Sequence, residues 1–275
     1  MSNSNSIRYL VSRRVVQLVA MLLLMGGNYW GWPILKGNLS QSMLLGTVPL
    51  ADPFAVLQLL AAGGMLAGNV LLGSLITVVF YGLLGGRTFC AWVCPMNPVS
   101  DLANWLAGKL ALNRGQTTRI FNRFTRFAVL ILALVLSFIL GVAAFEVISP
   151  IGMLQRGLVF GMGAGWLAVV AVFLFDLAVQ RNGFCGHLCP LGAFYATISP
   201  LSLVRIEHEH QKCTSCMKCL KVCPENEILE LVGQVSGSVL DGVCNNCGRC
   251  IEVCPDDALR FAFRKQAMSL ESGGS

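Results

Sequence analysis

Four long stretches of this chain carry no charged side chain, and no other feature constrains its fold as strongly. A helix rises about 1.5 Å per residue, so about 20 apolar residues cross the hydrocarbon core of a bilayer. Residues 53–86 are too many for one crossing, and their first part, 53–64, contains Gln58 and a Gly pair, so we expect a short interfacial helix there. The sequence therefore predicts four membrane helices, at residues 15–35, 65–86, 127–145 and 157–175.

The composition also favours a membrane protein. Hydrophobic residues make up 55% of the 275 residues and charged residues 12%, about half the charged share of a soluble domain. These values exclude a disordered chain, a nucleic-acid-binding tail protein and an ordinary soluble enzyme. The net charge of +6 is uneven, because residues 1–180 carry +7 and residues 181–275 carry −1. The apolar part is thus the basic part, which indicates membrane topology rather than binding to nucleic acid.

Loop charges predict the orientation, because loops rich in Lys and Arg stay in the cytoplasm. The N-terminal segment and the second loop hold most of the basic side chains, namely Arg8, Arg13, Arg14, Arg87, Lys109, Arg114, Arg119, Arg123 and Arg126. The other two loops hold only Lys36, Asp52, Glu146 and Arg156. We therefore expect a multi-pass protein of the bacterial cytoplasmic (inner) membrane with both termini in the cytoplasm. The first helix is expected to stay uncleaved, because its end lacks the small-x-small pattern of a cleavage site.

Eight of the twelve cysteines form two identical runs in the tail. Each run is Cys-x2-Cys-x2-Cys-x3-Cys-Pro, starting at Cys213 and at Cys244. This is the bacterial ferredoxin pattern for [4Fe–4S] clusters, in which the fourth cysteine of each run ligates the other cluster. A reducing cytoplasmic face disfavours disulfides, and zinc sites fit a doubled run poorly. The sequence therefore assigns cluster one to Cys213, Cys216, Cys219 and Cys254, and cluster two to Cys244, Cys247, Cys250 and Cys223.

The predicted fold is an α-helical membrane protein with a C-terminal α+β ferredoxin-like domain that binds two [4Fe–4S] clusters. Short strands are expected at residues 203–206 and 259–263 of that domain. The sequence predicts a cytoplasmic N-terminal segment (1–14), a four-helix membrane domain (15–200), the ferredoxin-type domain (201–265) and a disordered tail (266–275).

The other four cysteines form a second kind of motif, Phe-Cys-x3-Cys-Pro. Cys90 and Cys94 follow the second predicted helix, and Cys185 and Cys189 follow the fourth. Two crossings separate the motifs, so they share one membrane face and indicate two parallel-repeat helix pairs. A spacing of four places both sulfurs of a motif on one face of a helical turn. Three interpretations remain open: a structural cap, a thiol–disulfide pair in each motif, or a further metal centre that joins all four. His187 inside the second motif is expected to bond locally rather than to bind metal.

At this point the residues resemble the NapH family, the membrane ferredoxin-type proteins of periplasmic nitrate reductase systems. Four predicted helices, two Cys-x3-Cys-Pro motifs and a two-cluster tail carry the resemblance. Residues 37–53, 93–106 and 185–190 are also similar to that family. The cysteine motifs alone are shared with NosR-type regulators and with CcoG/RdxA-type copper-handling proteins. The resemblance covers about residues 8–265.

The resemblance implies a quinol dehydrogenase subunit. It would oxidise a membrane quinol and pass electrons to a NapG-type iron–sulfur protein, with a NapC-type tetrahaem protein as a further candidate partner, and on to periplasmic nitrate reductase. The sequence shows no molybdopterin signature or haem-attachment motif, so it is not expected to reduce nitrate itself. An assembly or metal-handling factor and a redox regulator, of the CcoG or NosR type, are the alternatives.

A quinol site would need a proton acceptor at the membrane, and the catalytic residues are unknown at this stage. Intramembrane ionisable groups are functional candidates by default. Lys36, Asp52 and Glu146 are candidates near the non-cytoplasmic side, and Asp176 lies near the cytoplasmic end of the fourth predicted helix. The plainer expectation is that these four groups mark helix ends in water.

Overall fold

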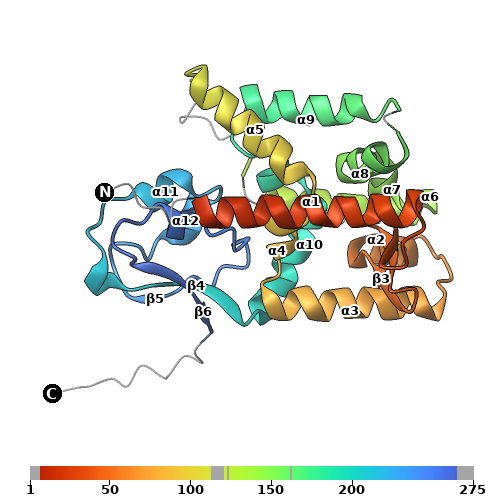
Figure 1. The fold of residues 1–275 in the computed structure, drawn as a ribbon, viewed down its shortest axis with the longest axis horizontal. Helices are drawn as coiled ribbons and strands as arrows, with labels where there is room; N and C mark the ends of the chain where they lie inside the picture. Colours follow the sequence, from red (N-terminus) through yellow and green to blue (C-terminus); the bar gives the residue numbers. More distant parts are fainter. Residues whose placement is uncertain (1–6, 113–120, 123, 162, 265–275) are drawn as a thin grey trace.

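The structure is a computed structural model that describes residues 7–112, 121, 122, 124–161 and 163–264. The predicted tail 266–275 and the loop residues Arg114, Arg119 and Arg123 lie outside the described residues. A layer of long helices forms one part of the molecule, and a small domain with a sheet lies at one end of this layer (Figure 1).

Four apolar helices form the layer, and α1, α3 and α9 run along a common axis (Figure 1). Only α1 is long and apolar enough to cross a membrane among the helices of the described residues. The others have 17, 16 and 13 residues, and at 1.5 Å per residue the last is about 20 Å long. Four membrane-spanning helices are therefore not confirmed by helix length. The bounds are α1 Arg8–Tyr29, α3 Gly68–Leu84, α6 Thr125–Leu140 and α9 Trp166–Ala178.

The helices begin and end at other residues than the charge-free stretches suggest. Helix α1 already begins at Arg8, and its first turns are held by an ion pair of Arg14 with Asp101 and by a hydrogen bond from Leu10 N to the Glu252 carboxylate. The stretch 157–175 is not one helix: α8 (Pro150–Phe160) ends at Gly161, whose φ of +100° leaves the helical region, and α9 begins five residues later. Glycines weaken a helix interior, and hydropathy alone does not register this break.

The end of the layer away from the ferredoxin domain holds a small sheet that the sequence did not predict. Strands β1 (Leu35–Gly37), β2 (Gln41–Leu44) and β3 (Val48–Ala51) are antiparallel and packed on α1 and α3. The approach to α1 is close, because a Cβ at Gly27 would lie 1.8 Å from the Leu35 carbonyl oxygen. The expected short helix is present as α2 (Pro53–Ala61), followed later by α7 (Ala144–Ile148).

The other end of the layer holds the two Cys-x3-Cys-Pro motifs. After the first motif the chain continues into an amphipathic helix that packs on α9, and after the second it continues into a helix that packs on α3 and α6. Helix α5 of the first half thus packs on the second half, whereas α10 packs on α6 of its own half and on α3 of the first half. The elements are α4 Thr88–Trp92, α5 Met96–Lys109, the π-helical turn η2 Phe184–Leu188, α10 Pro190–Ile198 and the 3₁₀ turn η3 Ser199–Leu201.

The ferredoxin domain is built on an antiparallel sheet of order β5-β4-β6. Strand β6 (Leu259–Phe263) coincides with a predicted strand, and β4 (Val204–His208) begins one residue later than predicted. Ile206, Leu229, Val239 and Leu259 form its buried core together with several cysteines. The remaining elements are η4 His210–Lys212, α11 Lys218–Val222, η5 Asn226–Leu229, β5 Gly237–Ser238 and α12 Arg249–Glu252.

Candidate functional site

Two cavities in the ferredoxin domain are each lined by four cysteines. Three of them are the first three cysteines of one run, and the other is the fourth cysteine of the other run. The quartets are those that the sequence assigns to the two clusters. The first cavity is lined by Cys213, Cys216, Cys219 and Cys254, and the second by Cys223, Cys244, Cys247 and Cys250. The two runs therefore exchange their fourth cysteines, because α11 and α12 pack against each other across the domain.

The loops that carry the cysteines repeat one backbone pattern. Ser215 and Met217 flank the second cysteine of the first run with φ of 54° and 56°, and Asn246 and Gly248 flank that of the second run with φ of 49° and 74°. Left-handed conformations are strained for residues other than glycine, and they persist only where the surroundings require them. Such alternation turns successive N–H groups towards one point and forms an anion-binding concavity. Both loops are therefore shaped to surround a negatively charged group.

This arrangement fits [4Fe–4S] clusters better than single metal ions. In the part of the chain that the structure describes, no three His, Cys, Asp or Glu side chains meet at the spacing of one metal ion. A cubane cluster needs another arrangement, since each thiolate binds a different iron. Four cysteines around one cavity, with backbone N–H groups turned inward, meet that requirement.

The two cavities differ in exposure. Cys216 of the first quartet is exposed, whereas Cys244, Cys247 and Cys250 of the second are buried. The ring of the buried His208 lines the first cavity, and its Nδ1 lies 2.8 Å from the Val235 carbonyl oxygen. The first cavity therefore faces outward, and the second faces the helical layer.

The four cysteines of the Cys-x3-Cys-Pro motifs come together at the end of the helical layer. All four belong to one apolar cluster, in which Phe89 stacks on Tyr195 with ring centroids 5.3 Å apart. The motifs repeat the same local hydrogen bond, from Cys94 N to Phe89 O at 3.0 Å and from Cys189 N to Phe184 O at 2.9 Å. The tertiary fold thus joins two motifs that are 95 residues apart by the numbering.

Burial gives these four thiols high pKa values. Burial raises the pKa of Cys189 to about 12, with a further rise from the nearby Cys90, and it raises the pKa of Cys94 and Cys185 well above the ordinary range. The Cys94 thiol is also affected by Cys90 and Cys189, which agrees with a shared site. Thiol–disulfide exchange needs an accessible thiolate. Metal coordination, in contrast, deprotonates a buried thiol directly.

Arg87 connects the motif cysteines with the second cavity of the ferredoxin domain. Its Nη2 donates to the Cys185 carbonyl oxygen at 3.1 Å, and its Nη1 donates to the Val243 carbonyl oxygen at 2.8 Å. The same Nη1 lies 3.3 Å from the carboxylate of Glu225, which also accepts from Arg126 at 2.9 Å. Val243 and Glu225 stand next to the cysteine runs in sequence, so this buried ion cluster fixes the domain on the helices.

A hydrogen bond from Trp92 also joins the first motif to the ferredoxin domain. The Trp92 indole N–H donates to the Asn246 carbonyl oxygen at 3.0 Å, and Asn246 Nδ2 donates to the Val204 carbonyl oxygen at 3.0 Å. Asn246 stands between Cys244 and Cys247, so a residue of the first motif directly contacts the loop that carries the second run. Sequence reasoning missed Arg87, Trp92 and Glu225 as connecting residues; their positions beside the motifs are the only signal that points to them.

Glu225→Gln is expected to destabilise the attachment of the ferredoxin domain by about 3–5 kcal/mol, because it leaves two buried arginines without their carboxylate. Glu225 is 10% exposed, and the side chains of Arg87 and Arg126 are 3% and 0% exposed. The midpoint of urea-induced bleaching of cluster absorption measures this loss. Glu230→Gln, at an exposed position of the same domain, is the matched control. Equal midpoints for both variants would contradict a structural role for Glu225.

Three of the four candidate proton acceptors lie away from the cysteines, whereas Asp176 lies beside the second motif. Lys36 lies on β1 and is exposed, and the Glu146 carboxylate accepts from Ser40, both at the far end of the layer. Asp52 caps α2 there by accepting from Phe54 N at 3.0 Å, and burial raises its pKa to about 7. Asp176 is fully buried and accepts from Phe184 N at 3.0 Å, which places it under the second motif. The expectation that it marks a helix end in water is wrong.

Three known ferredoxin-type proteins resemble the chain over most of its length. MauN of Methylorubrum extorquens, a methylamine utilization ferredoxin-type protein, is 44% identical over 83% of this chain and 79% of its own length. NapH of Escherichia coli, a ferredoxin-type protein, is 43% identical over 81% of this chain and 77% of its own length. NapH of Haemophilus influenzae is 45% identical over the same shares, 81% and 77%.

Two protein families match separate parts of the chain. Residues 66–113 and 158–206 match a family described as a 4Fe-4S binding domain, and each of these segments contains one Cys-x3-Cys-Pro motif. Residues 205–255 match a 4Fe-4S dicluster domain. No solved structure matches the chain.

Proposed function

The chain belongs to the NapH and MauN family of ferredoxin-type iron–sulfur proteins, and on this premise we propose that it carries electrons from a membrane quinol to a partner iron–sulfur protein. When bound, the clusters supply one-electron redox centres, and two of them match the two electrons of a quinol. The observation that carries the proposal is the connection of three sets of cysteines: Arg87 and Trp92 join the motif cysteines to the second run, and α11 packs on α12 between the two cavities.

The eight tail cysteines are the proposed ligands of two clusters. Cys213, Cys216, Cys219 and Cys254 would hold cluster one, and Cys223, Cys244, Cys247 and Cys250 would hold cluster two. The two cavities and the repeated left-handed residues support this assignment. Because Cys216 is exposed and the cysteines of cluster two are mostly buried, we propose that electrons leave through the first cavity.

We further propose that Cys90, Cys94, Cys185 and Cys189 hold a third iron–sulfur centre. Their place in one apolar cluster and the repeated hydrogen bond support a common centre, and the raised pKa values disfavour free redox thiols, which react as thiolates. The match of both motif segments to a 4Fe-4S binding domain supports the same proposal. Arg87 and Trp92 then hold this centre next to the second cavity.

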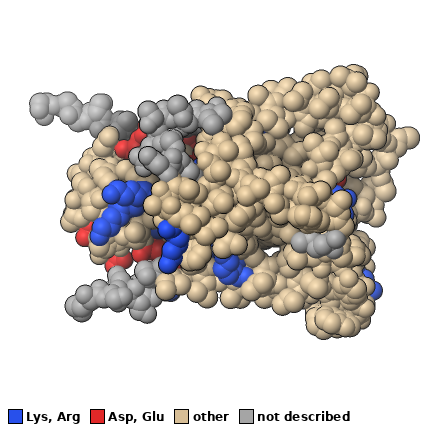
Figure 2. Space-filling model, turned by 90° about the horizontal axis from the view of Figure 1, so that it is seen from above, with Lys and Arg blue, Asp and Glu red and all other residues tan. Residues whose placement is uncertain are grey.

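The proposed location is the bacterial inner membrane, with four crossings and both termini in the cytoplasm. Many large apolar side chains of α1, α3, α6 and α9 are exposed, including Leu18, Leu75, Phe138 and Leu167. An apolar surface of this extent marks contact with lipid. Figure 2 shows that the helical layer is almost free of charged side chains on one face, whereas charged side chains gather towards the ferredoxin domain.

The partner remains open between two systems. NapH relatives favour a NapG-type iron–sulfur partner and electron flow towards periplasmic nitrate reductase, with a NapC-type tetrahaem protein as a further candidate. The 44% identity to a methylamine utilization protein favours an acceptor of that system equally well. Both systems need the same activity from this chain, namely transfer of electrons through iron–sulfur clusters.

Quinol-dependent reduction of the clusters tests the proposal. We expect menadiol to produce the EPR signal of reduced [4Fe–4S] clusters in membranes that contain the chain, and dithionite to give the full signal as a reference. If menadiol leaves the signal unchanged while dithionite develops it, the quinol proposal fails. An assembly factor or a redox regulator of the CcoG or NosR type would then be the better interpretation.

A further inference from the structure

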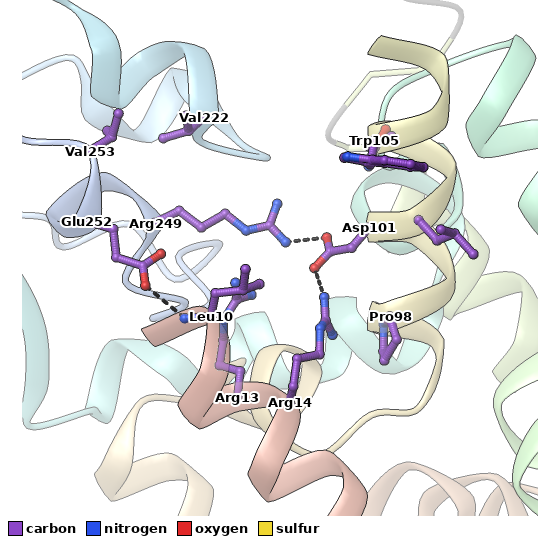
Figure 3. A pocket seen from close by; sticks show the side chains of 12 residues that line it. Leu10, Arg13, Arg14, Pro98, Asp101, Trp105, Val222, Arg249, Glu252 and Val253 are labelled. Carbon is purple, nitrogen blue, oxygen red and sulfur yellow. Dashed lines mark hydrogen bonds and ion pairs between the residues drawn. The ribbon is translucent and has the colours of Figure 1, made fainter. Parts of the chain in front are cut away.

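A cavity of about 610 Å³ lies where α1, α5 and the ferredoxin domain meet. Leu10 and Arg13 come from α1, Trp105 from α5, and Val222 and Arg249 from the ferredoxin domain, and Figure 3 shows these side chains around a common space. Ligand cavities usually have volumes of about 300–1,000 Å³. This cavity therefore has the size of a site for a small organic molecule.

Arg13 is the unusual residue of this cavity. Its side chain is completely buried, and its Nε donates to the Tyr9 carbonyl oxygen at 3.3 Å. Its Nη1 and Nη2 have no hydrogen-bond partner among the residues that the structure describes. Leaving charged donors buried and unpaired costs more free energy than leaving a neutral group unpaired. An acceptor on a bound molecule would remove this cost.

The other charged groups of the cavity neutralise one another. The Asp101 carboxylate is held between Arg14 and Arg249, and both ion pairs are drawn in Figure 3. The Glu252 carboxylate accepts from Leu10 N at 2.8 Å. Arg13 therefore supplies the free donors, and a neutral molecule with oxygen acceptors fits them. A guanidinium also recognises phosphate in bidentate fashion, so the experiment below separates a quinol from a lipid phosphate.

Apolar side chains form the remaining wall and the entrance. Leu102 and Trp105 of α5 are 55% and 59% exposed, and Leu10 of α1 is 39% exposed. Lys109 Nζ lies over one face of the Trp105 ring, 5.5 Å from its centroid, so a flat ring would stack on the other face. The exposed apolar residues beside Trp105 offer a route for an isoprenoid tail. A planar aromatic head group with two oxygens and an apolar tail satisfies both parts of the cavity.

The cavity borders the second cysteine cavity directly. Arg249 lines both of them, and it precedes Cys250 in sequence, as Val222 precedes Cys223. The ring of Tyr9 lies so close to Gly248 that a Cβ there would be 2.7 Å from it. A molecule bound against Arg13 would therefore be separated from the cysteines of cluster two by a single layer of residues.

We infer that this cavity binds the quinol head group, with Arg13 donating to one ring oxygen and Trp105 packing on the ring. The inference rests on the proposed function and assigns its substrate to the ferredoxin end of the helices, away from Lys36, Asp52 and Glu146. On oxidation the quinol loses two protons to water at the open side of the cavity. It loses two electrons, one to each of two iron–sulfur clusters, and becomes the quinone.

The test uses the full chain with its clusters in phospholipid nanodiscs and an azido-ubiquinone analogue. Light-induced labelling is expected on peptides that contain residues 8–14 or 98–105. Arg13→Gln is expected to raise the dissociation constant of the analogue about tenfold to a hundredfold, as expected for losing hydrogen bonds from a charged donor. Trp105→Ala, at an exposed position that folding tolerates, is expected to raise it about threefold to tenfold.

Asp52→Asn is the matched control, because asparagine keeps the helix cap and removes only the rival proton acceptor. It is expected to bind the analogue as the parent chain does. Labelling near Asp52, or unchanged binding in both cavity variants, overturns the inference. The inference is also overturned if Arg13→Gln weakens the binding of an anionic phospholipid only, because that result would indicate a lipid site. If menadiol reduces the clusters of the parent chain and of both cavity variants at equal rates, the inference fails and the proposed function stands.

Discussion

Replacing Cys247 by serine is expected to remove cluster two and to unfold the ferredoxin domain. Cys247 is buried and lines the second cavity together with residues that follow the first run. For small metal-binding domains, the free energy of binding the metal is largely the free energy of folding. The buried apolar core of this domain is small and includes Cys219, Cys244 and Cys250 themselves, so little remains to hold the fold without the cluster.

The measurement is iron per chain together with protease resistance of the tail. Cys247→Ser is expected to lose at least about four irons per chain, the content of one cubane, and to be cut within residues 205–264. Val235→Ser, at an exposed position of the same domain, should keep its iron and its resistance. A Cys247→Ser protein with the iron content of the parent chain would show that this cysteine is not a ligand.

Replacing Cys90 by serine is expected to remove the proposed third centre and to spare both tail clusters. The parent chain should hold about twelve irons and Cys90→Ser about eight, four for each cubane. The reason is spatial, since Cys90 packs with Cys94, Cys185 and Cys189 in the helical layer and lines neither ferredoxin cavity.

Iron analysis and EPR of the tail clusters measure this effect. Thr197→Ala, at an exposed position on α10, serves as the control and should keep about twelve irons. A parent chain with about eight irons would argue against a third [4Fe–4S] centre. Loss of the tail cluster signal in Cys90→Ser would contradict the division into independent sites.

Spacing along the chain was enough to predict where the ferredoxin domain lies, because cluster ligands obey a strict local pattern. The strand at 259–263 and the short helix after Asp52 also follow from local signals, namely alternating aromatic residues and an Asp-Pro cap. Helix ends were predicted less well. Gly161 breaks the stretch 157–175 through its backbone conformation, and a count of apolar residues does not detect such a break.

The sequence by itself determined which residues can bind clusters, since the two cysteine runs and the two Cys-x3-Cys-Pro motifs define the type of ligand and the spacing between ligands. Only the tertiary structure decided which groups meet: the four motif cysteines in one apolar cluster, Arg87 between three segments, and Arg13 in a cavity beside the second cysteine cavity. The physical reason is that ligand spacing is a property of one loop. Burial and the pairing of charges depend on packing between segments that are far apart in the chain.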